Sequence, residues 1–302
     1  MCNILQKTGQ VCQVSNEEKQ AFIGYYNKHS VIPVSQDLRD IKDFVFRRNY
    51  LYSSLGIPLN QLKNKTILEL GPGGAFNAVA TSAYFPDLYV FVDATKVSLE
   101  EIERKRVTGL LKSRKIEIIN SNIFDFYDER KFDCVIIEGV VPGQNQPEII
   151  LQHASSFVRE DGILITTTNS AASILSEICR RLFRIRICEG VSDFSSKVNL
   201  TANYFESHLK ALDTSTRTAT DWVIDSIFHD WHTGKYIFTI PDSIVALDNS
   251  FDFYNSSPRF LTDDRWYKKI NRSSESLNKL AVLQFSGLAG ALLDYRVPLT
   301  TR

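Results

Sequence analysis

The side chains best suited to chemistry stand at the ends of apolar runs that have the composition of buried strands. Glu69, Gly71 and Gly73 surround the end of the first run, Asp93 ends the second, and Glu138 ends the fourth. Glycines let a backbone turn approach a ligand closely, and the N–H groups that open a following helix attract an anionic group. A carboxylate at the end of the next strand accepts hydrogen bonds from ribose hydroxyls. The spacing therefore predicts a turn that binds a nucleoside-containing ligand.

The elements that position these side chains follow from hydrophobic patterning. From residue 65 onward, short β-branched runs alternate with longer amphipathic segments, which is typical of βαβ units. We expect strands at 66–70, 89–93, 116–120, 134–138 and 162–168, and helices at about 76–84, 98–111, 148–158 and 172–183. The sequence thus predicts an α/β fold with a doubly wound, mostly parallel sheet, whose ligands bind beyond the carboxyl ends of the strands.

Two appendages flank this predicted core. Residues 1–63 are expected to form an N-terminal helical arm that breaks near Pro33, because proline disfavours a helical conformation in the residue before it. Residues 64–188 form the core. Residues 189–302 mix polar and aromatic residues with weaker periodicity, and we expect a C-terminal cap that holds the substrate region and completes the sheet.

The glycine-rich turn distinguishes two cofactors. A dinucleotide fingerprint requires a third glycine three residues after Gly73, where this chain has Phe76. The acidic-x-Gly-x-Gly pattern over residues 67–77 instead resembles the first motif of class I S-adenosylmethionine-dependent methyltransferases. That resemblance implies S-adenosylmethionine as the cofactor, with Glu69 near its amino acid portion and Asp93 at its ribose.

The resemblance extends in order and spacing over residues 65–170. The segment 121–125 is similar to the one that flanks the adenine in this family, which implies cofactor contacts for Asn122 and Ile123. Segments 132–139 and 158–165 are similar to the family's fourth strand and to the turn into its fifth. Outside the core, 29–33 and 251–258 resemble bacterial methyltransferases that modify cell-surface saccharides and secondary metabolites, which implies a small-molecule or sugar-linked acceptor.

Three residues are candidates for catalysis. Glu138 should face the reacting centre and would contact the cofactor, orient the acceptor or take its proton. His29, in the arm, and His208, in the cap, are candidate bases, because histidine titrates near neutral pH. The sequence Glu138-Gly139-Val140-Val141-Pro142 does not resemble the Asp/Asn-Pro-Pro-aromatic motif of nucleic-acid amino-methyltransferases, so base methylation is disfavoured.

Composition narrows the class of partner. Thirty-five basic and thirty-five acidic residues balance, so no overall field would attract nucleic acid or an anionic membrane. The apolar runs are too short to cross a bilayer, and residues 1–18 lack the pattern of a secretory signal, so we expect a cytoplasmic protein. Five cysteines without a CxxC pair predict neither a metal site nor a disulfide framework. The oligomeric state stays open.

These observations predict an S-adenosylmethionine-dependent methyltransferase that methylates an oxygen of a small-molecule or sugar-linked acceptor. Two alternatives remain: a non-catalytic methyltransferase-like module that acts through a partner, and a nucleotide-linked oxidoreductase. Intact Glu69, Gly71, Gly73 and Asp93 favour retained cofactor binding but do not establish turnover.

Overall fold

A five-stranded sheet forms the centre of the computed structural model, which describes residues 16–29, 32, 35–211, 217–229, 237–247, 250–269, 277–294 and 296. Its strands are β1 (Thr66–Leu70), β2 (Leu88–Asp93), β3 (Lys115–Asn120), β4 (Phe132–Ile137) and β5 (Val158–Thr166). All neighbouring strands pair in parallel, in the order β3-β2-β1-β4-β5. The predicted parallel α/β sheet is confirmed, and its strand order reverses between β1 and β4.

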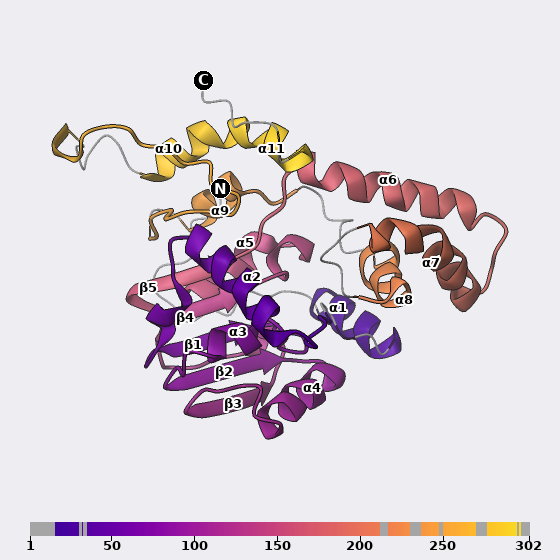
Figure 1. Ribbon diagram of the computed structural model, residues 1–302, viewed down its shortest axis with the longest axis horizontal. Helices are drawn as coiled ribbons and strands as arrows, with labels where there is room; N and C mark the ends of the chain where they lie inside the picture. The colour runs from indigo at the N-terminus through magenta and orange to yellow at the C-terminus, as the bar shows by residue number, and fades with distance from the viewer. Residues whose placement is uncertain are drawn as a thin grey trace.

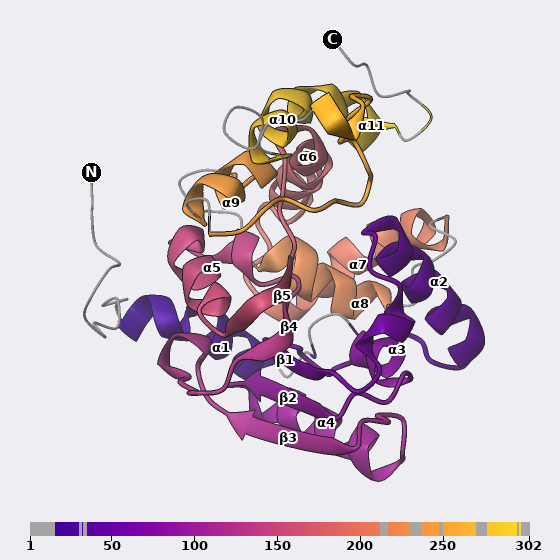
Figure 2. The ribbon, with the colours of Figure 1, turned by 90° about the vertical axis from the view of Figure 1, so that its left-hand side faces the viewer.

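Helices cover both faces of the sheet, as Figure 2 shows with the sheet seen near its edge. One face packs on α2 (Ile41–Ser54), α3 (Ala78–Ser82) and α4 (Lys96–Val107), and its core includes Ile67, Phe91 and Ile102. The other face packs on α5 (Pro147–Ser155) and on the end of α9 (Ile240–Ala246). Alternate strand residues point to opposite faces, and helices cover both faces. The near-continuous apolar runs of the strands are therefore buried on both sides of the sheet.

The N-terminal arm consists of α1 (Asn16–His29), α2 and the 3-10 turn η1 (Leu59–Leu62). The side chain of Asp40 begins α2 by accepting a hydrogen bond from the backbone N–H of Asp43 at 2.9 Å. Phe44 and Tyr52 then anchor α2 to the sheet. In contrast, α1 lies beside the C-terminal helices (Figure 1).

The described C-terminal part contains helices joined by irregular segments, the longest of which runs over residues 250–266. It contains α6 (Ala171–Ile187), α7 (Phe194–Lys210), α8 (Ala219–Trp222), the π-helix η4 (Val223–Phe228), α9, α10 (Leu277–Gln284) and α11 (Ala289–Leu293). Short 3-10 turns complete the chain: η2 (Ile123–Asp125), η3 (Val141–Gly143), η6 (Tyr267–Lys269) and η7 (Phe285–Leu288). One apolar cluster joins α7 and η4, and a second joins α9 to α10 and α11.

The expectation that the cap completes the sheet is not met in the described part of residues 189–302, since none of those residues forms a strand. The reason is helical periodicity. Val198, Ala202 and Leu209 lie on one buried face of α7, a spacing that a strand would divide between two faces. The division at residues 63 and 188 stays a prediction.

Candidate functional site

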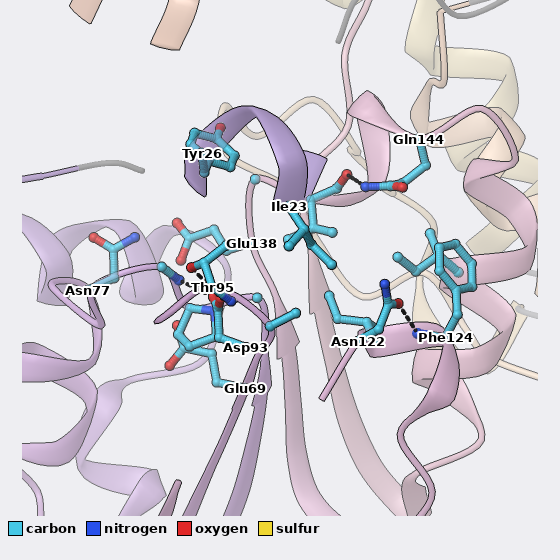
Figure 3. A pocket seen from close by; sticks show the side chains of 18 of the residues that line it. Ile23, Tyr26, Glu69, Asn77, Asp93, Thr95, Asn122, Phe124, Glu138 and Gln144 are labelled. Atoms are coloured by element: carbon cyan, nitrogen blue, oxygen red, sulfur yellow. Dashed lines mark hydrogen bonds between the residues drawn. The ribbon is translucent and has the colours of Figure 1, made fainter. Parts of the chain in front are cut away.

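A pocket opens at the carboxyl edge of the sheet, where β1, β2 and β4 end (Figure 3). Such an edge, next to the reversal of strand order, is where open α/β sheets bind ligands. All seven residues that the sequence assigned to the cofactor line this pocket: Glu69, Gly71, Gly73, Asp93, Asn122, Ile123 and Glu138. Segments far apart in the sequence are thus brought to one cavity.

The turn after β1 can be built only with glycine at its first position. Gly71 has a φ of +66°, and a Cβ there would lie 2.6 Å from Cγ2 of Val140 and 3.2 Å from Cδ1 of Ile123. A side chain would therefore strain the backbone and fill the pocket wall. This close packing places the backbone of the turn in the lining of the pocket.

Lys105, a residue that the sequence did not mark, supports the turn from behind. Its side chain is fully buried, its Nζ donates to the carbonyl oxygen of Gly74 at 2.8 Å, and it forms an ion pair with Glu101. The ammonium also lies 3.4 Å from the ring centroid of Phe76, the residue in place of a third glycine. Burial lowers the pKa of Lys105 to about 8, against the opposing effect of Glu101.

Asp93 is held in place by its own neighbours. Its Oδ1 accepts hydrogen bonds from the backbone N–H and the hydroxyl of Thr95, both at 2.8 Å, and its Oδ2 accepts from the backbone N–H of Gly73 at 3.2 Å. The residue is buried, and burial raises the pKa of this carboxyl while those hydrogen bonds lower it. Oδ2 accepts the longer of these hydrogen bonds and is the oxygen with more room for a ribose hydroxyl.

Glu69 lies deeper than Asp93. It is buried, and the hydroxyl of Tyr89 donates to its Oε2 at 2.6 Å. Burial raises the pKa of Glu69 to about 7, the Tyr89 hydrogen bond opposes that shift, and the negative charge of Glu138 adds to it. A cation entering the pocket would favour the ionised form of Glu69.

Glu138 follows β4 and forms an ion pair with helix α2. Its two carboxylate oxygens accept from Nη1 and Nη2 of Arg48 at 2.9 and 2.8 Å. The Arg48 guanidinium carbon also lies 5.3 Å from the ring centroid of the fully buried Tyr52. The bidentate contact fixes the orientation of Glu138 and gives Arg48 an internal partner.

Asn122, Ile123 and Phe124 form the wall beyond β3. Figure 3 shows Asn122 and Phe124 across the pocket from Asp93. The Asn122 side chain begins η2 by accepting from the backbone N–H of Phe124 at 3.0 Å. This cap holds an apolar surface and a polar edge against the cavity. Such a combination suits a planar, hydrogen-bonding ring.

The two candidate histidines do not line the pocket. The ring of His29 stacks on Phe194 with centroids 4.4 Å apart, and burial lowers the pKa of this histidine. His208 lies on α7, where its Nε2 is 3.1 Å from Nη2 of Arg180 and its ring is near Trp222. Of the three catalytic candidates, the structure places only Glu138 at the cavity.

Sequence patterning gave no sign that Tyr26 on α1 and Asp225 on η4 would come together in the lining. They meet across 199 positions of the chain. No local motif indicates such a contact.

The described residues hold no group of three or more His, Cys, Asp or Glu side chains arranged to bind a metal ion. Within those same ranges, no helix has the length and apolar composition that crossing a bilayer requires.

Comparison with known proteins gives a distant sequence match. A bifunctional methyltransferase of Rickettsia bellii (strain RML369-C) is 23% identical over 205 residues, which cover 64% of this chain and 33% of that protein. The chain is similar to class I S-adenosylmethionine-dependent methyltransferases. It spans about a third of the length of this curated relative. No protein-family model matches the chain.

Two solved methyltransferase structures match this chain with low overall similarity. PKMT2 from Rickettsia typhi, in complex with AdoHcy, is 14% identical with a TM-score of 0.46, covering 82% of this chain and 50% of that chain. Magnesium protoporphyrin IX methyltransferase from Synechocystis PCC 6803, with bound SAM, is 16% identical with a TM-score of 0.36, covering 49% and 74%.

Proposed function

We propose that this chain binds S-adenosylmethionine in the pocket at the carboxyl edge of the sheet and transfers its methyl group to a small acceptor. One observation carries the proposal: the seven residues assigned to the cofactor from sequence all line that pocket. These seven residues lie at or just after the ends of four different strands. Residues chosen without regard to a ligand would not be expected to line a single cavity.

The lining fits each part of this cofactor. Glu69 and Glu138 offer carboxylates to its ammonium group, the turn at Gly71 and Gly73 lines the cavity beside them, and Asp93 offers Oδ2 to the ribose. Asn122 and Ile123 would flank the adenine. When bound, the cofactor supplies a methyl group already activated by its sulfonium. The protein then has to align the acceptor, exclude water and receive one proton.

We further propose an oxygen acceptor, on a small-molecule or sugar-linked hydroxyl. Glu138 supports this reaction by contacting the reacting groups from the end of β4, in an orientation that Arg48 fixes. His29 and His208, which pack away from the cavity, gain no support from the geometry. The resemblance of segments 29–33 and 251–258 to methyltransferases of saccharides and secondary metabolites supports the acceptor class.

Calorimetric titration with S-adenosylmethionine and S-adenosylhomocysteine tests the cofactor. We expect micromolar binding that weakens at least about tenfold in Asp93→Ala, because a hydrogen bond to a charged group contributes about 1.5 to 3 kcal/mol. The matched control is Asp87→Ala, just before the same strand at the opposite edge of the sheet, which should bind normally. A folded wild-type protein that bound neither ligand would refute the proposal.

A further inference from the structure

Helix α1 and the π-helix η4 close the pocket together. The hydroxyl of Tyr26 donates to Oδ1 of Asp225 at 2.7 Å, and the hydroxyl of neighbouring Tyr25 donates to the carbonyl oxygen of Ile224 at 2.6 Å. Tyr26, Asp225 and Ile23 all line the cavity. Figure 3 places Tyr26 and Ile23 on the short helix that faces Asp93 and Glu69 at the strand ends. The arm and the cap thus supply the wall opposite the predicted cofactor residues.

Asp225 lies on the π-helix η4. Val223 and Ile227 are fully buried in the cluster with α7, which the Ile224 side chain also contacts, whereas the Ile224 carbonyl and the Asp225 carboxylate face α1 through their hydrogen bonds. A π-helix inserts an extra residue per turn, and such segments occur often at functional sites. Here it lets one short segment serve a packed core on one side and the cavity on the other.

Arg217 holds the Asp225 carboxylate from behind. Its Nη1 lies 2.7 Å from Oδ2 of Asp225, and both side chains are only 12% exposed. Burial, with a further contribution from Asp225, raises the pKa of Tyr26 well above its usual value, so this phenol stays protonated and donates. Oδ2 of Asp225 therefore accepts from the Arg217 cation, whereas Oδ1 accepts from the neutral hydroxyl of Tyr26. A hydroxyl group of a ligand can replace the Tyr26 hydroxyl at Oδ1.

We propose that Tyr26 and Asp225 form the acceptor subsite, that it takes an uncharged hydroxyl group, and that Asp225 receives the proton of this hydroxyl. This proposal rests on the proposed methyltransferase function. The carboxylates of Asp225, Glu138, Glu69 and Asp93 all line the same cavity, and no Lys or Arg stands among its described lining residues, so a phosphate or carboxylate on the acceptor would have no cationic partner there.

The reaction balances without a further reactant. The acceptor oxygen forms a bond to the methyl carbon while the carbon–sulfur bond breaks, and the electron pair of that bond stays on sulfur as a thioether. The hydroxyl proton passes to Oδ1 of Asp225 and then to solvent. Tyr26 acts as a positioning residue, because its hydroxyl holds Oδ1 until the acceptor arrives and then donates to the acceptor oxygen.

A cofactor analogue tests the subsite without knowledge of the acceptor. Sinefungin carries an amino group where the transferred methyl stands, so a carboxylate facing that position should favour it over S-adenosylhomocysteine. We expect calorimetry on the full chain to give about tenfold tighter binding of sinefungin. Asp225→Asn should abolish most of this preference and leave S-adenosylhomocysteine affinity near wild type, with a lower melting temperature because the largely buried Arg217 loses its counterion.

Two further variants sharpen the result. Tyr26→Phe should keep the preference, because the carboxylate remains, and Asp221→Asn, on the neighbouring helix α8, should match wild type. Equal affinities in wild type, or a preference that Asp225→Asn leaves intact, would overturn the subsite. Failure of wild type to bind S-adenosylhomocysteine would instead count against the proposed function itself, so the two failures are distinct.

Discussion

Arg48 donates a hydrogen bond to each carboxylate oxygen of Glu138, at 2.9 and 2.8 Å, and so connects helix α2 to the end of strand β4. The two side chains are 11% and 20% exposed, which shields the pair from most solvent screening. Because Glu138 lines the pocket, the ion pair links the placement of the N-terminal arm to the shape of the site. Its removal should therefore affect both folding and ligand binding.

Replacing Arg48 with methionine should lower the free energy of unfolding by about 2 to 4 kcal/mol, since it leaves a largely buried carboxylate without its counterion. Urea denaturation measures this change, and S-adenosylhomocysteine affinity should fall with it. Arg47→Met serves as the control, because Arg47 pairs with Asp43 at 3.3 Å on the exposed side of α2 and should change stability by less than about 0.5 kcal/mol. Equal effects of the two variants would contradict this assignment.

Glu69 should make cofactor affinity depend on pH. Its pKa in the free protein is about 7, and a bound ammonium group favours the ionised carboxylate, so binding below pH 7 releases a proton. Affinity for S-adenosylhomocysteine should rise with pH up to about 7 and then level off. Calorimetry in buffers of different ionisation enthalpy counts the released proton.

The matched variant for this pH dependence is Glu69→Gln, which removes the titrating group and keeps the size of the side chain. Its affinity should be lower and nearly constant between about pH 5.5 and 8. If Glu69→Gln kept the wild-type pH profile, another group would be responsible and Glu69 would not contact the ammonium.

The sheet could be predicted because its information is local. Each strand is a short apolar run between turn residues, and the order of the acidic and glycine positions along the chain placed Glu69, Asp93 and Glu138 at one edge. The strand boundaries were predicted less exactly. The sequence predicted a strand at 162–168, but β5 begins at Val158, because the polar residues 159–161 interrupt the apolar pattern at the start of the strand.

The other half of the site was not predictable from patterning. Tyr26 meets Asp225 across 199 positions and Arg48 meets Glu138 across 90, and no local pattern around Tyr26, Arg48 or Asp225 indicates these partners. The histidines were chosen for their chemistry without any indication of where the arm and cap would fold. Packing of helices onto the sheet decides such contacts, and one sequence does not reveal it.

Gly71→Ala should weaken cofactor binding at least about tenfold, because the new Cβ would meet Val140 at 2.6 Å on a backbone with positive φ. Gly109→Ala is a matched control: Gly109 also has a positive φ, of +72°, but a Cβ there meets nothing within 4 Å. Both variants should lose about 1 kcal/mol of stability from backbone strain, yet only Gly71→Ala should lose affinity in calorimetry. Normal binding by Gly71→Ala would exclude the turn from the site.

Lys105→Met tests whether the support behind the glycine-rich turn reaches the ligand. The substitution keeps an unbranched side chain over Phe76 but removes the donor to the Gly74 carbonyl and the partner of Glu101, so stability should fall by about 2 to 3 kcal/mol. S-adenosylhomocysteine affinity should fall about tenfold, as the turn loses its fixed position. Lys96→Met, whose side chain is 85% exposed on the same helix, should change neither quantity measurably. A loss of stability without a loss of affinity would mean that Lys105 holds α4 to the core and leaves the turn to position itself.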